Sequence, residues 1–183
     1  MMLSKERQQT AFDVLSGTFG YTSRMAAPRV VKVVVSSGTG KKRDAKQLEL
    51  IADRLAHITG QKPSSRSAKQ SIASFKVREG DPVGFSITLR GARMFDFLDK
   101  LIHVALPRTR DFRGIPRTAI DAMGNITIGI REHTIFPETA DEDLKDVFGL
   151  AVTVVTTART REEAEAFFRH LGFPLRVDGD AKR

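Results

Sequence analysis

The 183-residue sequence predicts one α+β domain, a mostly antiparallel sheet with helices packed on one face and a long basic loop. Residues 85–90 and 126–130 alternate apolar and polar side chains with a period of two, as half-buried strands do. Segments with helical spacing interrupt the strands irregularly, rather than in regular strand–helix repeats. The chain is 40% apolar and no Pro/Gly/Ser linker divides it, so we interpret residues 1–183 as a single domain.

Start and stop signals define the predicted helices. Asp44 is a candidate N-cap for a helix that ends at Gly60, and Thr160 with Glu163 forms a capping box before a helix that ends at Gly172. Asp99 lies on a helix closed by Pro107, and we expect it on a solvated face. The predicted helices cover residues 4–19, 44–60, 91–107 and 160–172.

Periodicity and β-branched residues define the predicted strands. Residues 29–35 are rich in Val and too short for a helix, so they are expected to form a buried strand. Between the strands, residues 69–82 and 108–117 are polar and are expected to be loops. The predicted strands cover residues 29–35, 64–68, 85–90, 126–130 and 150–157.

Composition excludes several classes of function. The chain has no Cys, which excludes disulfide scaffolds, thiolate metal sites and Cys nucleophiles. No His spacing suits a metal, and we expect no cofactor and no catalytic site. Residues 38–42 resemble a phosphate-binding loop but lack its first Gly and its final Ser or Thr, so a nucleotide hydrolase is disfavoured. No apolar run would span a bilayer, so we expect a cytoplasmic protein without membrane contact.

The charge distribution favours a polyanionic partner. The net charge is +8, with +5 in residues 1–60, +7 in residues 61–120 and −4 in residues 121–183. Five basic residues fall between Lys62 and Arg78, with Ile72 and Phe75 among them, a combination that suits partly single-stranded RNA. The alternative is a flexible basic loop. A second basic cluster comprises Arg108, Arg110, Arg113 and Arg117.

Short strings that occur in order along most of the chain carry a family resemblance. They include GQKP at residues 60–63, AKQSIASFKVREG at 68–80, TLRG at 88–91, PRTRDFRG at 107–114 and IFPE at 135–138. Together they resemble the bacterial large-subunit ribosomal protein five family, whose members bind 5S rRNA. The resemblance runs from about residue 21 to residue 174.

The resemblance implies a structural RNA-binding protein and not an enzyme. It implies that the protein anchors 5S rRNA in the central protuberance of the large subunit. Further implied contacts are the large-subunit rRNA, the P-site tRNA, neighbouring large-subunit proteins and small-subunit protein thirteen. A free RNA-binding or RNA-chaperone protein acting outside the ribosome is the alternative.

Candidate site residues fall into three groups, which combine the family resemblance with the distribution of charge. The 5S rRNA contacts match Ser36, Gln61, Thr88 and Arg90. We expect the loop of residues 69–80, together with the preceding Arg66, to contact rRNA and tRNA. The candidate contact residues are Arg66, Lys69, Ser71, Ile72, Phe75, Lys76 and Arg78. We expect an acidic stretch to form the protein bridge, through Glu138, Asp141, Glu142, Asp143 and Asp146.

The chain departs from the family pattern in two places. Ser36 stands where the family has an Asn that contacts RNA, and a hydroxyl cannot present the paired groups of an amide. Residues 120–126 lack an Arg and two aromatic residues of the family pattern. RNA contacts at both places are therefore in question, and the tail 177–183 has no interpretation.

Overall fold

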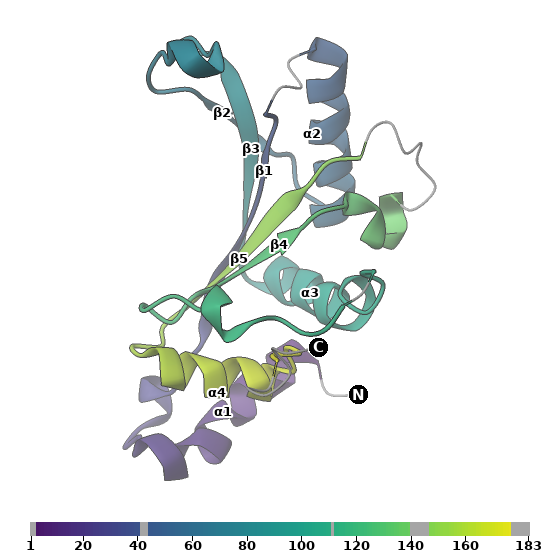
Figure 1. Ribbon diagram of the computed structural model, residues 1–183. Coiled ribbons are helices and arrows are strands. Elements are labelled where there is room, and N and C mark those ends of the chain that lie inside the picture. The colour runs from purple at the N-terminus through teal and green to yellow at the C-terminus, as the bar shows by residue number, and fades with distance from the viewer. Residues whose placement is uncertain (1–2, 41–43, 111, 140–146, 177–183) are drawn as a thin grey trace. The chain divides into compact units, whose positions relative to one another are not determined.

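The computed structural model describes residues 3–40, 44–110, 112–139 and 147–176. Within those residues it contains four α-helices and a five-stranded sheet with the strand order β2-β3-β1-β5-β4 (Figure 1). The α+β class predicted from the sequence is confirmed. The helices are α1 (Ser4–Phe19), α2 (Ala45–Thr59), α3 (Ala92–Lys100) and α4 (Arg161–Leu171). The strands are β1 (Val30–Gly38), β2 (Ser64–Ser67), β3 (Pro82–Leu89), β4 (Ile126–Ile130) and β5 (Leu150–Thr156).

The described chain forms two compact units, each assembled from separate segments. Among the described residues, unit 1 comprises 3–33, 90–110, 112–128 and 153–176, and unit 2 comprises 34–40, 44–89, 129–139 and 147–152. Strands β1, β4 and β5 each contribute residues to both units. That residues 1–183 constitute a single domain stays a prediction.

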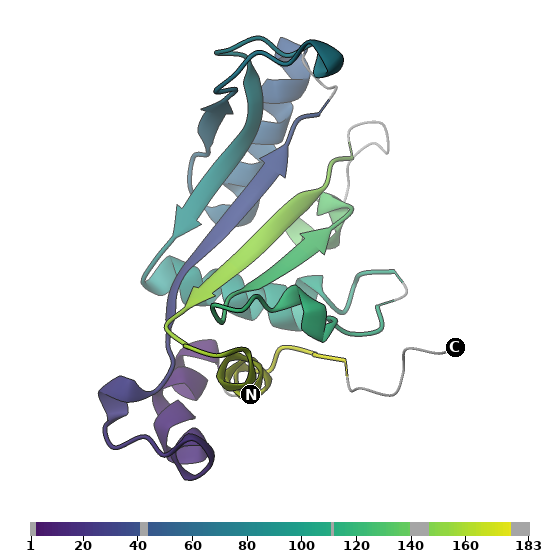
Figure 2. The same cartoon turned by 60° about the vertical axis from the view of Figure 1, so that its left-hand side comes forward.

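Unit 1 is built on packing between helices. Its apolar core includes Ala11 and Leu15 of α1, Phe97 of α3, and Phe167 and Phe168 of α4, all buried. Helix α1 contacts both α3 and α4. Figure 2 shows α1 and α4 side by side. Helix α3 continues into a π-helical turn, Leu101–Ala105, so the predicted helix extends almost to Pro107 as expected.

Asp99 caps helix α1 and is not on a purely solvated face, which corrects the expectation from the sequence. Its Oδ1 accepts hydrogen bonds from the Ser4 backbone N–H at 2.8 Å and from the Ser4 hydroxyl at 2.6 Å. Ser4 is 1% exposed. The carboxylate therefore satisfies an N–H group of the first helical turn from a position 95 residues away in the chain.

The capping box of α4 forms only in part. The Thr160 hydroxyl accepts from the Glu163 N–H at 3.2 Å, as predicted. The Glu163 carboxylate, however, accepts from the Arg159 N–H at 2.7 Å and from the Tyr21 hydroxyl at 2.5 Å. Burial raises the pKa of Tyr21 above its usual value, and the hydrogen bond to Glu163 and the charge of that carboxylate add to the shift. Glu163 thus ties the start of α4 to the segment that follows α1.

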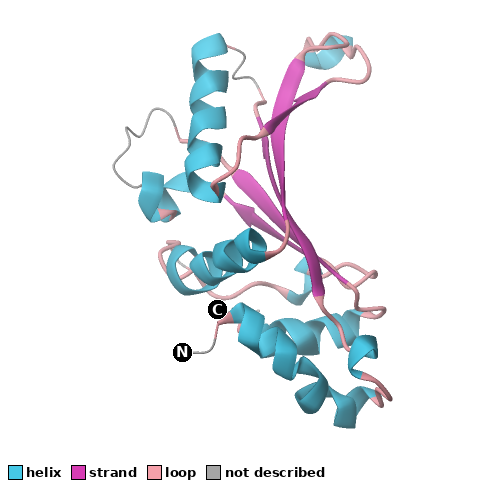
Figure 3. Ribbon diagram, turned by 180° about the vertical axis from the view of Figure 1, so that it is seen from behind, coloured by secondary structure: helices cyan, strands magenta, loops and turns pink. Residues whose placement is uncertain are grey.

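Unit 2 places one helix against one face of its strands. Helix α2 presents buried Ile51, Leu55 and Ile58, and β3 presents buried Ile87 and Leu89. Helix α2 contacts β3, and Figure 3 shows it on a single side of β1 and β3. As predicted, the helix ends at Gly60, which adopts a left-handed conformation with φ 67°. Asp44 occupies the N-cap position without a side-chain capping bond.

Residues 69–80 form a closed hairpin-like extension rather than an irregular loop. At its base, the Ala68 N–H donates to the Asp81 carbonyl at 2.8 Å and the Gly80 N–H donates to the Ala68 carbonyl at 3.0 Å. Near its tip, Ile72 and Val77 pair as an isolated antiparallel bridge. Hydrogen bonds therefore hold the extension, because hardly any of its side chains is buried.

Gly84 on β3 allows close approach to β1. A Cβ atom at this position would lie 2.7 Å from the Ser37 carbonyl oxygen. We expect Gly84→Ala to lower the free energy of unfolding by about 1–3 kcal/mol, because backbone must shift to admit the methyl group. Gly129→Ala on β4 is the matched control, since no atom of the described residues, apart from Gly129 and its two chain neighbours, lies within 4 Å of its Cβ position. Equal urea midpoints for the two variants would contradict this prediction.

Candidate RNA interface

Buried and half-buried residues alternate along strand β1. Val33, Val35 and Ser37 are buried, whereas Val34 and Ser36 are half-buried. The Ser37 hydroxyl donates to the Gly149 carbonyl at 2.7 Å. Ser36 therefore lies on the strand face opposite the core, with its hydroxyl on the side that α2 leaves uncovered.

The register of β2 against β3 extends this uncovered face. Ser64 pairs with Ser86 and Arg66 pairs with Gly84 in an antiparallel arrangement. Directly opposed residues share a face, and Thr88 lies two residues beyond Ser86 on the same side. The side chains of Ser36, Ser64, Arg66, Ser86 and Thr88 form what we call the open face of unit 2. In Figure 2, α2 lies behind these strands and no helix of unit 2, as far as described, lies in front of them.

The open face contains two residues that sequence reasoning did not assign as RNA contacts. Ser64 and Ser86 oppose each other in the β2–β3 pair. The alternation of β3 already placed Ser86 beside Thr88, but the pairing with β2 was needed to add Ser64. The same pairing places Arg66 on a strand next to Gly84, and not in the extension of residues 69–80.

Gln61 and Arg90 lie at chain turns. Gln61 is half-buried in the turn after α2, and its carbonyl accepts from the Thr59 hydroxyl at 3.1 Å. Arg90 follows β3 directly and is exposed. Ser36, Gln61 and Thr88 belong to unit 2, while Arg90 begins a segment of unit 1.

The extension of residues 69–80 presents charge and apolar surface together. Phe75 is 71% exposed and Ile72 is 45% exposed. Lys69, Ser71, Lys76 and Arg78 are also exposed. Lys76 holds a left-handed conformation with φ 51°, which turns the chain at the tip. This arrangement suits stacking against a base with cations beside the phosphates.

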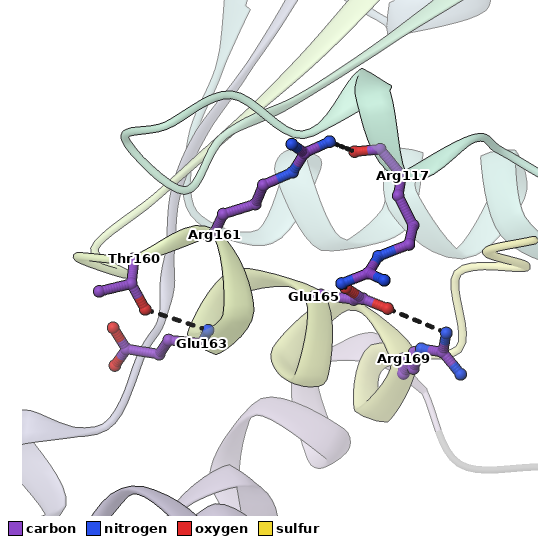
Figure 4. Close-up of polar contacts among 6 residues, drawn as sticks. All are labelled: Arg117, Thr160, Arg161, Glu163, Glu165 and Arg169. Atoms are coloured by element: carbon purple, nitrogen blue, oxygen red, sulfur yellow. Dashed lines mark hydrogen bonds and ion pairs between the residues drawn. The ribbon is translucent and has the colours of Figure 1, made fainter. Parts of the chain in front are cut away.

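Arg117 differs from the other members of the second basic cluster. Arg108, Arg110 and Arg113 are exposed, whereas an Arg117 guanidinium nitrogen lies 2.6 Å from Oε2 of Glu165. Figure 4 shows Glu165 between Arg117 and Arg169, whose guanidinium is 2.9 Å from Oε1. The side chain of Glu165 is only 11% exposed. The Arg117 side chain therefore neutralises a largely buried carboxylate.

Comparisons with known proteins agree along nearly the whole chain. A sequence model of ribosomal protein L5 matches residues 23–78, and a model of the C-terminus of the same ribosomal protein family matches residues 82–175. Large ribosomal subunit protein uL5 of Halothermothrix orenii is 45% identical over 175 residues, which cover 95% of this chain and 98% of the relative. The uL5 protein of Streptococcus pyogenes serotype M5 is 46% identical over 174 residues, with 94% and 97% covered. The chain belongs to the uL5 family of ribosomal proteins.

Membership in the uL5 family confirms the resemblance read from the sequence and assigns the chain to a family of structural proteins, not enzymes. The alternative of a nucleotide hydrolase rested on residues 38–42, of which Lys41 and Lys42 lie outside the described residues. Among the residues described, no group of three or more His, Asp or Glu is arranged to hold a metal ion. No helix in the described ranges is both long and apolar enough to cross a bilayer.

One of the two departures from the uL5 pattern, residues 120–126, keeps a well-defined turn. The Asp121 carboxylate accepts from the Asn125 backbone N–H at 2.7 Å and from its side-chain amide at 2.9 Å. Asn125 in turn accepts from the Thr156 N–H at 3.2 Å. Gly124 has φ 77° and packs against Ala158 too closely for a Cβ atom. Met123 stands 73% exposed at the tip of this turn.

The Asp121 turn predicts a pH dependence of stability. Partial burial opposes ionisation of Asp121, but the hydrogen bonds donated by Asn125 and Met123 outweigh it and hold the pKa below its usual value. A carboxyl whose pKa is lower in the folded state stabilises the protein above the pKa of the unfolded state, and this contribution disappears as pH falls through the folded pKa. We therefore expect Asp121→Asn to flatten the loss of unfolding free energy between about pH 5 and pH 2. Asn125→Ala should do so in part, and urea titrations with superimposable pH profiles for all three proteins would contradict this account.

Of the residues expected to form the protein bridge, only Glu138 lies within the described residues. It belongs to the short helical turn Pro137–Thr139 and is exposed. Asp141, Glu142, Asp143 and Asp146 fall outside the described residues, as does the tail 177–183.

Proposed function

We propose that this protein is a structural constituent of the large ribosomal subunit that binds 5S rRNA and helps to anchor it in the central protuberance. The observation that supports this proposal is the open face of unit 2, where hydroxyl groups and one arginine occupy the uncovered side of β1, β2 and β3. Hydroxyls donate and accept hydrogen bonds to phosphate, ribose 2′-OH and base edges, and Arg66 adds a cation. Ser36 and Thr88 belong to this face, and Gln61 and Arg90 follow α2 and β3 closely in the chain.

Sedimentation of the tagged full-length protein tests the proposal. We expect it to travel with large ribosomal subunits in a gradient at moderate salt and to carry 5S rRNA when subunits are dissociated. A protein that remains at the top of the gradient while still binding RNA would support the alternative of an RNA chaperone acting outside the ribosome.

The extension of residues 69–80 is proposed to reach large-subunit rRNA and the P-site tRNA. Exposed Phe75 and Ile72 lie among its cations, and it buries almost no apolar surface. Local opening therefore costs little free energy, and we expect amides of residues 69–80 to exchange much faster than those of β3. Replacement of residues 70–79 by two glycines should leave 5S rRNA binding intact and weaken tRNA binding to the ribosome. Amide protection equal to that of β3, or loss of 5S binding, would contradict this assignment.

We further propose that the protein contacts small-subunit protein thirteen, as a bridge between the subunits, and neighbouring large-subunit proteins. The net charge of −4 in residues 121–183 supports a surface that faces a basic protein rather than RNA. Exposed charge pairs are each worth only about 0–1 kcal/mol, which suits a contact that must shift as the subunits rotate.

A further inference from the structure

A groove in unit 1, whose lining residues are all different from those of the open face, has the character of a ligand site. It lies between α1 and the short helical turn Arg24–Ala26 and has a volume of about 180 Å³. That volume is smaller than a pocket for a drug-sized molecule and is enough for one flat ring system. The groove is therefore sized for a single aromatic group.

The lining of the groove combines apolar surface, amides and cations. Phe12 and Met25 provide the apolar surface, with Met25 82% exposed, and Arg24 and Arg29 lie exposed on the same groove. No Asp or Glu of the described part of the chain lines it. The charge of the groove is thus positive and selects an anionic ligand.

Two glutamines add hydrogen-bonding groups of defined direction. The Oε1 atom of Gln8 accepts from the Val30 N–H at 2.8 Å, which fixes its amide and leaves the NH2 group as a donor. Gln9 lines the groove one residue further along α1 and is exposed. Side-chain amides are the groups that pair with base edges.

We propose that this groove binds one unstacked nucleotide of RNA, with the base against Phe12 and Met25 and the phosphate beside Arg24 and Arg29. A base supplies the flat ring, and the phosphate supplies the negative charge that the two guanidinium groups select. The residues of this site all belong to unit 1, and none of them belongs to the open face of unit 2. If this groove does not bind RNA, the proposed binding of 5S rRNA by the open face is unaffected.

Methyl NMR of the full-length protein tests the proposal directly. The chain has five methionines, so methyl-labelled Met gives few signals. We expect a short oligouridylate to shift the Met25 signal upfield to saturation, because a base stacked on it exerts a ring current. The matched control is Met123, which is 73% exposed and also belongs to unit 1. Its signal should not move, and equal shifts of both methyls would overturn the proposal.

Abasic RNA and charge-matched variants separate base insertion from plain electrostatics. An abasic oligonucleotide of equal length should bind about fivefold to a hundredfold more weakly, because stacking on the base is lost. Arg24→Ala with Arg29→Ala should weaken oligouridylate binding at least tenfold more than Arg93→Ala with Arg159→Ala, which removes equal charge from exposed positions of the same unit. Equal affinities in either comparison would overturn the proposal. So would an acidic peptide that shifts Met25 when RNA does not, which would make the groove a protein-binding site.

Discussion

We expect the affinity of the protein for 5S rRNA to fall by about 10³–10⁵ between roughly 50 and 200 mM salt, as for a protein that neutralises some 6–10 phosphates. The first 120 residues carry the positive charge, with +5 in residues 1–60 and +7 in residues 61–120. Each cation that pairs with a phosphate releases counterions, so the logarithm of the binding constant falls linearly with the logarithm of salt concentration. Fluorescence anisotropy with labelled 5S rRNA over this salt range measures the slope.

Arg90→Ala should reduce both the affinity and the slope. The loss of one charge-assisted contact costs about 1–3 kcal/mol, and the slope should fall by about one. Arg159→Ala removes the same charge from an exposed position in unit 1 and is the control. A salt-independent affinity would contradict an interface that relies on phosphate contacts, and equal effects of the two variants would contradict a specific contact at Arg90.

The second large effect is expected at Glu165, where we predict that Glu165→Ala lowers the free energy of unfolding by about 1–3 kcal/mol. This carboxylate is 11% exposed and joins Arg117 to Arg169. An Nη atom of Arg161 also donates to the Arg117 carbonyl at 2.5 Å, so the cluster ties α4 to the segment before β4. The loss is below that of a fully buried pair, because the arginine side chains are 40% and 46% exposed and can turn toward water.

Glu162→Ala on the same helix is the control for Glu165. Glu162 is exposed in the first turn of α4, and its loss should cost less than about 1 kcal/mol. Thermal and urea unfolding measure both variants. Equal destabilisation by the two substitutions would show that the Arg117–Glu165–Arg169 cluster contributes nothing beyond helix-end charge.

Local sequence signals predicted the helices and strands, because each of these signals acts between residues that are close together in the chain. The alternating Ile residues of β4, the Val run of β1 and Gly60 after α2 each act within a few residues. Most of the predicted boundaries consequently lie within a few residues of those observed. The polar face of β3 could likewise be assigned from the alternation of apolar and polar residues alone, and this alternation placed Thr88 on that face.

Features that depend on distant partners could not be predicted in this way. Asp99 looks like a solvated acid until Ser4 is found beside it, and nothing in the sequence indicates that Glu165 lies against Arg117. The groove in unit 1 brings α1 together with residues that follow it through an irregular turn, so no periodicity signals it. In each case the sequence shows the chemical character of the residues but does not show which distant residues they contact.

The central claim is that the open face of unit 2, with Arg90 at the end of β3, binds 5S rRNA. The most direct test is the dissociation constant of the full-length protein for 5S rRNA with Ser36→Ala, Thr88→Val and Arg90→Ala combined. The matched control combines Ser74→Ala, Thr118→Val and Arg159→Ala, which remove the same functional groups from exposed residues outside both that face and the groove of unit 1. We predict a loss of about a hundredfold or more for the first combination and less than about threefold for the second. Equal dissociation constants for the two combinations would contradict the assignment.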